Sequence, residues 1–473
     1  MSKRVVGRVN ELKVLTNTLS SRRSELIAVY GRRRIGKTYL IREFFGNKIE
    51  FSFTGLEVGN RADQIENFML KLNEFTNDRY ENEKPVSWLA AFTLLKKYLK
   101  TIKVTKTKKV IFIDEFPWTD SPKSRFLPAF ENFWNDYCTT RTDLVVVVCG
   151  SAASYMMKKI IRNKGGLHNR ITQRIELQPF TLHETEAFFK YKDNPVEQYD
   201  LLKMYMAFGG VAEYLEHVNT GESSVQAIDR MCFSNGGFLE NEYADIFNSL
   251  YGQNSYHEQI IHVLATARKK GLTRTDLLKK TNISTGGQFS KSLEELILSG
   301  FVLKYDSYRE KSKTTLYRIY DEFCLFHLQF MIPYRGSKWT SVYQKQEYRT
   351  WCGYAFETIC LKHIKEIKKG LECDQIESKN YTWSSSKAQV DLVVDRDDKT
   401  VNLCEIKYYG DEYELDASDL KKLRNRETQF RESKESKKGL KTAVITTWGV
   451  KQNQYSNAIV RKIVTMKSLF IQA

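Results

Sequence analysis

The chain has 473 residues, more than one hydrophobic core accommodates, so its length predicts roughly two to four domains. Apolar residues make up 41% of the sequence and aromatic residues 13%, which excludes a disordered chain. The formal charge of +17 favours a polyanionic partner, with nucleic acid ahead of an anionic membrane surface. No apolar run reaches the roughly eighteen residues of a membrane span, and there is no signal peptide, so we expect a soluble cytoplasmic protein.

The first predicted elements are a strand over residues 25–30 and a helix over residues 39–45, joined by a glycine-rich loop. The loop matches the phosphate-binding pattern G-x-x-x-x-G-K-[ST] at every fixed position. Such a unit points successive backbone N–H groups and a helix N-terminus at one spot, which suits a polyphosphate. We predict that a nucleoside triphosphate binds here, with Lys37 on the β- and γ-phosphates and Thr38 on Mg²⁺. The whole predicted loop comprises Gly31, Arg32, Arg33, Arg34, Ile35, Gly36, Lys37 and Thr38.

A second strand, over residues 110–113, ends in two carboxylates, Asp114 and Glu115. The apolar run before the acid pair indicates a central parallel strand whose carboxyl end meets the nucleotide. Asp114 would complete the Mg²⁺ shell through water, and Glu115 would polarise the attacking water. A base near the γ-phosphate, in addition to a metal ligand, favours hydrolysis over nucleotide sensing alone.

A third strand, over residues 144–149, precedes Gly150 and Ser151, and strands alternate with helices to about residue 178. This alternation predicts a doubly wound parallel sheet. The hydroxyl of Ser151 also suits a cap for the next helix. From residue 179 to about residue 250 only helical spacing is found, which suits a lid over the nucleotide.

Residues 257–320 have the pattern of a winged helix. Three helices and two strands are expected, over residues 258–267, 273–280, 284–299, 300–305 and 314–319. Helix-turn-helix units place the later helix in the major groove, so Gln288, Ser290 and Lys291 are candidate DNA contacts. Winged helices also serve as protein-contact modules or spacers, and this alternative stays open.

Near the C-terminus, residues 389–394 and 401–407 predict a hairpin around a polar turn. Strand side chains alternate, so Glu405 and Lys407 share one face of their strand. Counting back through the turn sets Asp391 roughly opposite Glu405. Two carboxylates and an ammonium group would then converge.

Two adjacent carboxylates repel each other unless a cation lies between them, and Mg²⁺ with its oxygen ligands fits. Glu357, on an upstream helix, would bring a third carboxylate to Asp391 and Glu405. Lys407 would orient or activate a metal-bound water for attack on a phosphodiester. The alternative is an ordinary charged hairpin with one solvated face.

Eight cysteines are scattered along the chain without C-x-x-C pairs or nearby histidines. Two of them, Cys149 and Cys404, lie inside apolar strands. We therefore expect small core residues in a reducing compartment rather than disulfides or zinc ligands.

The first half of the chain resembles the archaeal-type AAA+ ATPase family within the STAND-like P-loop group. This resemblance is carried by the motifs at residues 31–38, 113–115 and 149–151. The C-terminal part resembles the nuclease-like domain often fused to such ATPases, of the PD-(D/E)XK restriction-endonuclease superfamily. Here the matching segments are G-x-x-F-E at 353–357, Gln-Val-Asp at 389–391 and Glu-Ile-Lys at 405–407.

The resemblance implies roles that the residues alone do not establish. It implies ATP rather than GTP, contact between Ser151 and the γ-phosphate, and an arginine finger at Arg170 ahead of Arg174. A finger acting in trans would require at least a dimer. It also implies a further core strand at residues 443–447, and a basic helix flanking the active face that carries Lys421, Lys422 and Arg424.

The predicted fold class is α/β, in four parts: a P-loop AAA+ core at residues 1–178, a helical lid at 179–250, a winged helix at 251–332 and a restriction-endonuclease-like domain at 333–473. We expect an ATP-hydrolysing protein that controls a Mg²⁺-dependent DNA nuclease, in mobile-DNA maintenance or defence. The alternative is a signalling or scaffold ATPase whose nuclease-like domain only binds DNA or protein. A helicase is disfavoured, since no further motor motif follows Ser151.

Overall fold

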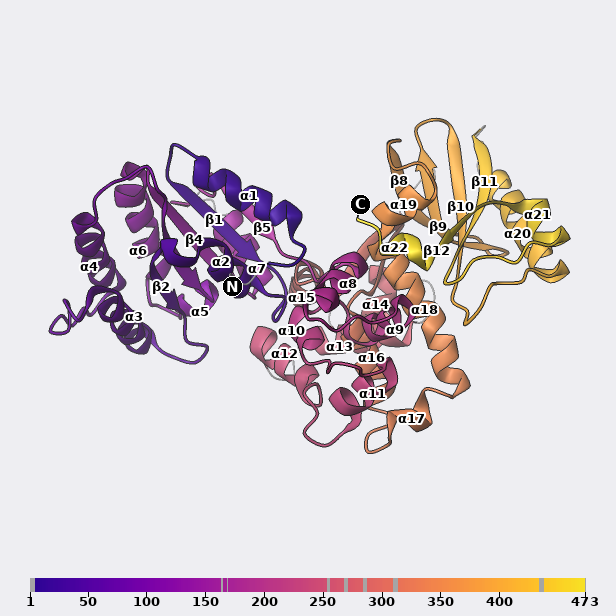
Figure 1. Cartoon of the computed structure of the whole chain (residues 1–473), viewed down its shortest axis with the longest axis horizontal. Helices are drawn as coiled ribbons and strands as arrows, with labels where there is room; N and C mark the ends of the chain where they lie inside the picture. The colour runs from indigo at the N-terminus through magenta and orange to yellow at the C-terminus, as the bar shows by residue number, and fades with distance from the viewer. Residues whose placement is uncertain are drawn as a thin grey trace. The chain divides into compact units, whose positions relative to one another are not determined.

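The structure, a computed structural model, describes residues 5–162, 165–167, 169–252, 256–267, 271–283, 287–308, 314–433 and 438–472. The chain folds into two units (Figure 1). The first comprises Met1–Pro179 with Asn248–Gly252, and the second comprises Phe180–Phe247 with Gln253–Ala473. Within the described ranges, no helix combines the length and the apolar character that crossing a bilayer requires.

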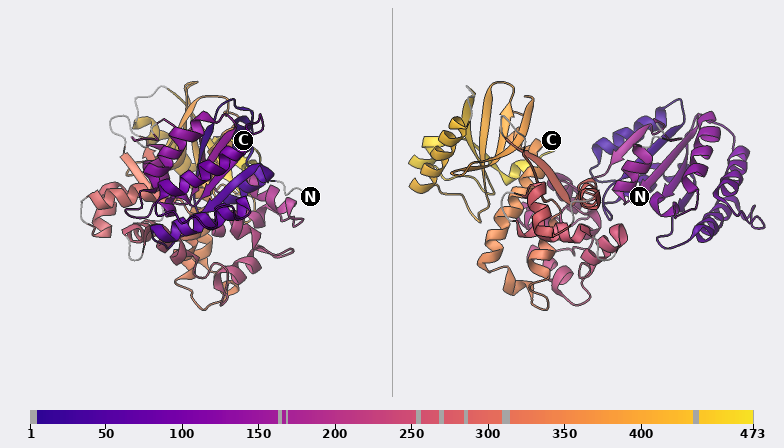
Figure 2. Two further views of the ribbon diagram at one scale, coloured as in Figure 1. Left: turned by 90° about the vertical axis from the view of Figure 1, so that its left-hand side faces the viewer. Right: turned by 180° about the vertical axis from the view of Figure 1, so that it is seen from behind.

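The first unit is built on a parallel five-stranded sheet, as the alternation of strands and helices predicted. The strand order is β2-β3-β4-β1-β5, and each neighbouring pair is parallel. The strands are β1 (Glu25–Tyr30), β2 (Ile49–Thr54), β3 (Lys109–Asp114), β4 (Leu144–Gly150) and β5 (Gln173–Glu176). Every residue of β1 and β4 is buried, because helices flank both faces of the sheet (Figure 2). The order places β4 between β1 and β3, so the loops at the carboxyl ends of these three strands lie along one edge of the sheet.

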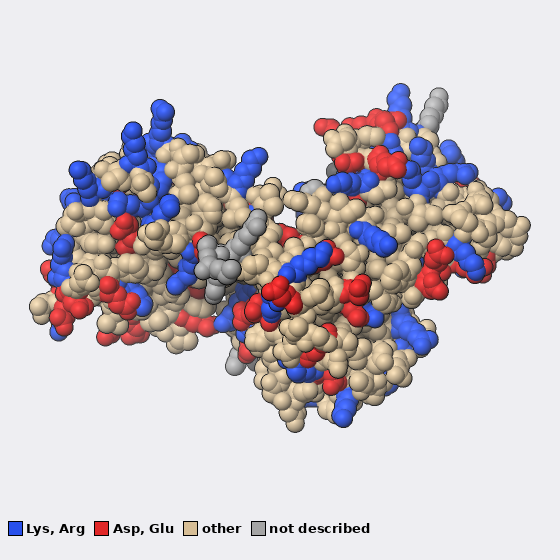
Figure 3. Space-filling model, in the orientation of Figure 1, with Lys and Arg blue, Asp and Glu red and all other residues tan. Residues whose placement is uncertain are grey.

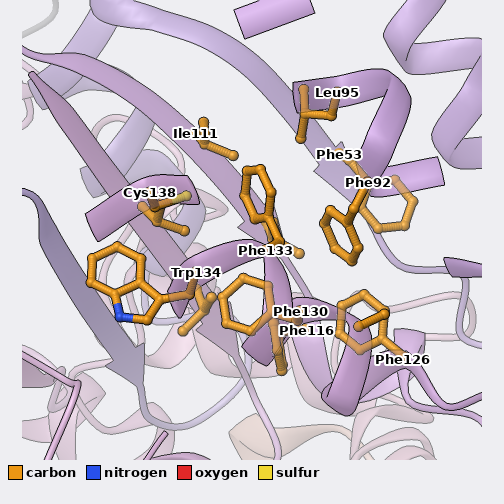
Figure 4. Close-up of a cluster of buried hydrophobic side chains, with 14 of the residues drawn as sticks. Phe53, Phe92, Leu95, Ile111, Phe116, Phe126, Phe130, Phe133, Trp134 and Cys138 are labelled. Atoms are coloured by element: carbon orange, nitrogen blue, oxygen red, sulfur yellow. The ribbon is translucent and has the colours of Figure 1, made fainter. Parts of the chain in front are cut away.

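Aromatic side chains fill the core on one face of this sheet. They come from α3 (Arg61–Thr76), α4 (Trp88–Thr101), α6 (Phe126–Asn132) and the segment Phe133–Tyr137 that continues α6, and they pack on alternate residues of the strands. Trp88 and Phe126 meet edge to face with ring centroids 4.7 Å apart. Phe116, Phe130 and Phe133 lie in the same cluster as Phe126 (Figure 4). The remaining helices of this unit include α1 (Val9–Ser20), α2 (Lys37–Phe45), α5 (Phe116–Thr119) and α7 (Ala153–Tyr155). This packing anchors β3 just before its terminal carboxylates.

The segment predicted as a lid is helical, and its residues Phe180–Phe247 belong to the second unit. Its helices are α8 (Leu182–Tyr191), α9 (Gln198–Phe208), α10 (Ala212–Glu216), α11 (Ser224–Ile228) and α12 (Glu242–Tyr251). α9 packs against α16 (Glu322–Phe326) and α18 (Gln346–Lys362). Gly210 follows α9, and a Cβ atom there would lie 1.9 Å from the Phe180 carbonyl oxygen. The role of these helices as a lid stays a prediction.

Three helices and a two-stranded hairpin follow in the predicted order. They are α13 (Tyr256–Thr266), α14 (Arg274–Thr281), α15 (Gly287–Leu298), β6 (Val302–Ser307) and β7 (Thr314–Ile319). Thr273 and Asp276 form a reciprocal capping box that starts α14. The predicted start of the third helix, residues 284–286, lies outside the described residues. Assignment of these elements as a winged helix stays a prediction.

The C-terminal strands form a mixed sheet to which the β6–β7 hairpin is joined. The order is β12-β11-β10-β9-β8-β6-β7, with β8 (Ser378–Ser384), β9 (Gln389–Arg396), β10 (Thr400–Lys407), β11 (Gly439–Thr446) and β12 (Val460–Thr465). β9 is antiparallel to both β8 and β10, whereas β10, β11 and β12 are parallel. α20 (Ala417–Glu432) connects β10 to β11.

Tyr308 joins the hairpin to the C-terminal sheet. Its backbone N–H donates to the Thr382 carbonyl at 2.8 Å, and its hydroxyl donates to Asp395 Oδ2 at 2.9 Å. Its ring packs against Tyr381 and Phe430, with centroid distances of 4.8 and 5.6 Å. The β6–β7 hairpin and the C-terminal sheet are therefore parts of one packed structure.

All eight cysteines are buried free thiols. Cys138 and Cys149 lie in the first unit, and the second unit holds Cys232, Cys324, Cys352, Cys360, Cys373 and Cys404. Burial raises the pKa of the Cys138 and Cys149 thiols well above the ordinary value.

Candidate functional site

The glycine-rich loop lies between the end of β1 and the start of α2. Gly31 and Gly36 have φ angles of +148° and +89°, and a Cβ atom on Gly31 would lie 2.2 Å from the Leu177 carbonyl oxygen. Lys37, the first residue of α2, donates from Nζ to the carbonyl oxygens of Gly31 at 3.1 Å and Arg32 at 2.7 Å. The ammonium group is therefore buried inside the turn of the loop. Of the other loop side chains, Arg32 and Ile35 are buried, and Arg33 and Arg34 are half-buried.

Thr38 meets Asp114 at the carboxyl edge of the sheet. The Thr38 hydroxyl donates to Asp114 Oδ2 at 2.7 Å, and Asp114 Oδ1 accepts the Glu115 N–H at 3.0 Å. Mg²⁺ in nucleotide sites takes oxygen ligands and retains several waters. The contacting hydroxyl and carboxylate of Thr38 and Asp114 supply oxygen ligands of that kind.

Glu115 faces the end of the neighbouring strand β4. Its carboxylate accepts the Ser151 hydroxyl at 2.8 Å and the Ser151 N–H at 3.2 Å. Glu115 has φ +43°, in the left-handed region, and residues held in such conformations cluster at active sites. The fold thus brings Lys37, Thr38, Asp114, Glu115 and Ser151 to one edge of the sheet.

Arg8 belongs to this region although sequence reasoning did not single it out. The side chain is buried, with Nη1 donating to the Gln178 carbonyl at 2.6 Å and Nη2 to the Ile35 carbonyl at 3.1 Å. It therefore supports the phosphate-binding loop from the side of the N-terminal segment. Nothing in the sequence distinguishes this arginine from the other basic residues of a strongly basic chain.

The two arginine-finger candidates are exposed. Arg170 lies in a turn, where its N–H donates to the Leu167 carbonyl at 3.0 Å, and Arg174 lies on β5. An arginine finger acts on the nucleotide of a neighbouring copy, so this role stays a prediction.

A second cluster of charged side chains forms where β9 and β10 pair. The register places Leu392 opposite Cys404, and continuing it by one residue places Asp391 opposite Glu405. Asp391 Oδ2 accepts the Ile406 N–H at 3.0 Å. Glu405 Oε1 pairs with Lys407 Nζ at 2.8 Å.

In this second cluster the pKa values of Asp391 and Lys407 are both shifted upward. Burial raises the pKa of the Asp391 carboxyl well above its usual range, and the nearby Glu405 and Glu357 carboxylates add to the effect. Burial disfavours the charge on Lys407, but the Glu405 carboxylate outweighs it, and the net effect raises the pKa of that ammonium group. The cluster therefore favours one proton, or one additional cation, close to Asp391.

Two arginines that sequence reasoning missed hold the other carboxylates. Arg318, on β7, is buried and donates to Glu357 Oε1 and to Thr358 Oγ1, each at 2.8 Å. Arg426, on α20, forms an ion pair with Glu405 Oε2. A signal for Arg426 existed, because it lies three residues after buried Leu423 and four before buried Phe430, on the helix face that packs on the sheet.

The predicted metal ligands of this cluster are carboxylates, the ligand type that Mg²⁺ takes. Over the described part of the chain, however, no group of three or more His, Cys, Asp or Glu side chains is arranged to hold a metal ion. Glu357 and Glu405 are instead neutralised by Arg318, Lys407 and Arg426. Metal binding by Glu357, Asp391 and Glu405 stays a prediction.

The candidate DNA contacts Gln288, Ser290 and Lys291 are exposed on α15. The Ser290 hydroxyl accepts from Arg274 Nη2 at 2.9 Å, which links α15 to the start of α14. DNA contact through this face stays a prediction.

Comparison with known proteins identifies the N-terminal part. Residues 5–218 match the family described as an ATPase domain predominantly from Archaea. Along nearly its whole length, the chain is similar to an uncharacterized protein of Methanocaldococcus jannaschii, MJECL04. The two are 24% identical over 431 residues, which are 88% of this chain and 90% of that protein. A shorter match, 46% identical over 43 residues, covers 9% of this chain and 73% of an uncharacterized ATP-binding protein of the same organism.

Among solved structures, a Walker-type ATPase of Pyrococcus abyssi has a similar fold. It superimposes with a TM-score of 0.51 at 15% identity, covering 69% of this chain and 96% of that one. This similarity is one of fold, and the parallel sheet of the first unit agrees with it. Residues 5–218 therefore match the model of an ATPase domain found predominantly in Archaea, and the first unit has the α/β fold of a P-loop ATPase core.

Proposed function

We propose that the first unit is an AAA+-type ATPase that binds ATP with Mg²⁺ at residues 31–38. Glu115 acts as the base in ATP hydrolysis. The observation that carries this proposal is the pair of contacts at the carboxyl edge of the sheet. Thr38 reaches Asp114 at 2.7 Å, and Ser151 reaches Glu115 at 2.8 Å. These contacts join the start of α2 to the end of β3, and the end of β3 to the end of β4, which supports a metal-ligand pair beside a general base.

In this proposal each side chain has one task. The loop N–H groups and Lys37 bind the phosphates, with the ammonium group exchanging the carbonyl oxygens of Gly31 and Arg32 for phosphate oxygens. Thr38 and Asp114 hold Mg²⁺, which neutralises charge on the phosphate oxygens. Glu115 accepts the proton of the attacking water, and Ser151 orients the Glu115 carboxylate.

The test of nucleotide binding is ATP hydrolysis and ATP affinity of the full chain beside Lys37→Ala. We expect Lys37→Ala to lose both, because the only buried ammonium group in the loop is removed. Lys84→Ala, which changes an exposed lysine of the same unit, is the matched control and should hydrolyse ATP at the parental rate. Parental ATP affinity in Lys37→Ala would contradict the assignment of the loop.

We further propose that the second unit carries a Mg²⁺-dependent nuclease acting on DNA, whose activity depends on the nucleotide state of the first. Support comes from the convergence of Asp391, Glu405 and Lys407 on adjacent strands, together with a raised Asp391 pKa that a divalent cation would relieve. In this proposal Asp391 and Glu405 hold the metal, and Lys407 positions the attacking water. Arg426 must release Glu405 for the metal to bind.

The nuclease is tested by incubating the full chain with plasmid and linear DNA in Mg²⁺, with and without ATP. We expect cleavage that is lost in Asp391→Ala while ATP hydrolysis continues, and that responds to ATP only when Lys37 is intact. Asp374→Ala, at an exposed carboxylate of the same unit, is the control and should cleave normally. Equal cleavage by Asp391→Ala and the parent would reject the proposed nuclease site.

One observation favours a second candidate, a signalling or scaffold ATPase whose C-terminal domain only binds DNA or protein. Arginine side chains pair with both Glu357 and Glu405, so the cluster is already balanced without a metal. This alternative predicts DNA binding that needs no Mg²⁺ and survives Lys407→Ala. Absence of cleavage under every metal and nucleotide condition, with ATP hydrolysis intact, would select it.

A further inference from the structure

Three loops meet at the amino edge of the sheet in the first unit, opposite the edge that carries the phosphate-binding loop. They precede β1, β3 and β4, and comprise residues 20–24, 102–108 and 139–143. Because β3, β4 and β1 are parallel neighbours, the loops at their amino ends lie side by side.

Lys108 fastens the three loops together. Its side chain is buried, and its Nζ donates to the Arg23 carbonyl and, at 2.8 Å, to the Thr142 carbonyl. Burial lowers the pKa of this ammonium group, against the opposing pull of Glu25 and Asp143. The edge is therefore a fixed surface rather than three independent loops.

On this edge the negatively charged side chains are buried and the exposed charged side chains are positive. The carboxylates Glu25 and Asp143 point inward, with side chains 4% and 0% exposed, and each is paired with an arginine. The exposed charged side chains of the three loops are all cations, Arg22, Arg23, Lys103 and Lys106. The upper edge of the left-hand unit in Figure 3 is accordingly rich in Lys and Arg.

Hydroxyl groups are interleaved with these cations. Thr105, Thr107, Thr139, Thr140 and Thr142 are all exposed on the same loops. Arginine, lysine, serine and threonine are the side chains that contact nucleic-acid phosphates. No aromatic side chain of these described loops is available to anchor in a lipid interface, so a membrane fits less well.

We propose that this amino-edge surface, defined by Arg22, Arg23, Lys103 and Lys106, binds the phosphate backbone of duplex DNA without reading its sequence. It lies at the opposite strand ends from Lys37 and Glu115, and it requires neither a nuclease nor a metal. DNA held there would be tethered to the ATPase domain itself.

The test measures affinity of the full chain for a short labelled duplex at several salt concentrations, in EDTA and without nucleotide. The surface variant is Lys103→Glu with Lys106→Glu. The matched control is Lys84→Glu with Lys123→Glu, two exposed lysines of the same unit that give the same change in net charge. Unchanged ATP hydrolysis in both variants checks folding, and Lys103→Gln with Lys106→Gln replaces the surface variant if the glutamates disturb the loop.

We expect the surface variant to bind at least about tenfold more weakly and to lose about two from the slope of log affinity against log salt, since each phosphate contact contributes about 0.9. The control should keep the parental slope. Equal losses in both variants would overturn the proposal in favour of net charge alone. Parental duplex binding by the surface variant, with loss of binding only to phosphatidylserine vesicles, would overturn it in favour of a membrane.

Discussion

Glu115 combines a left-handed backbone, at φ +43°, with a carboxylate held by Ser151. Glu115→Gln keeps the size and hydrogen-bonding capacity of the side chain but removes the base. We expect ATP affinity to persist and hydrolysis to fall by about 10²- to 10⁴-fold, the usual contribution of a positioned general base. Phosphate release and binding of a fluorescent ATP analogue separate the two effects. Hydrolysis at the parental rate would exclude Glu115 as the base.

The buried ion pair between Arg141 and Asp143 contributes to the stability of the first unit. Arg141 donates to both Asp143 oxygens, at 2.8 and 2.9 Å, and also to the Leu99 carbonyl. Burial disfavours the Asp143 carboxylate, but the hydrogen bonds and charge of Arg141 outweigh it and lower the pKa of Asp143 below its ordinary value.

A carboxyl group with a lowered folded-state pKa stabilises the fold above its unfolded pKa of about 3.9, and this stability is lost as the pH falls through the folded pKa. We expect Asp143→Asn to lower the free energy of unfolding at neutral pH by about 3–5 kcal/mol, because Arg141 is left buried and unpaired. The difference between parent and variant should shrink below about pH 4. Urea unfolding at both pH values measures it.

Asp136→Asn is the control for this prediction. Asp136 pairs with Lys96 while its side chain is 67% exposed, so its loss should change the free energy of unfolding far less than Asp143→Asn does. Equal effects of the two substitutions would show that burial of the Arg141–Asp143 pair does not matter.

At the scale of elements, the junction between the β6–β7 hairpin and the C-terminal sheet depends on Tyr308. Tyr308→Phe removes only the hydrogen bond to Asp395, a change of about 1 kcal/mol. Tyr308→Ala also removes the ring contacts with Tyr381 and Phe430, and we expect faster amide hydrogen exchange in β6, β7 and β8 with little change in β11. Uniform acceleration across all of these strands would instead indicate that the second unit opens as a whole.

The elements with strong hydrophobic patterns could be predicted from sequence, and the weakly patterned ones could not. β1, β3 and β4 are continuous apolar runs, and β9 and β10 flank a polar turn, so each was predictable. β8 reads Ser-Lys-Asn-Tyr-Thr-Trp-Ser, of which only Trp383 is buried, and its place is set by pairing with β9. Its existence depends on a tertiary partner that the local sequence does not encode.

Prediction of the phosphate-binding site and of the Asp391–Glu405 cluster was limited in the same way by tertiary packing. Motif spacing was enough to anticipate that Thr38 and Asp114 would lie near each other. It did not reveal Arg318, because which arginine meets a given carboxylate depends on how β7 packs, and the helical spacing that marks Arg426 was overlooked. Sequence reasoning therefore found the acids and Lys407, and missed the two arginines that also neutralise those acids.

At the scale of the whole molecule, the buried cysteines divide unequally between the two units, with two in the first and six in the second. Only an accessible thiolate reacts with an alkylating reagent, and burial suppresses both accessibility and ionisation. We expect the native chain to take up alkylating reagent slowly at all eight positions.

Because the two units differ in their number of cysteines, the number of alkylated cysteines shows which unit unfolds first. With increasing urea and a brief alkylation pulse, mass spectrometry should show a species carrying two labels if the first unit unfolds first, and six labels if the second does, provided that each unit unfolds cooperatively. A continuous spread of label numbers would contradict cooperative unfolding of the units. Adding ATP should then delay labelling of Cys138 and Cys149 selectively, because a ligand that binds only the folded first unit raises the free energy needed to open it.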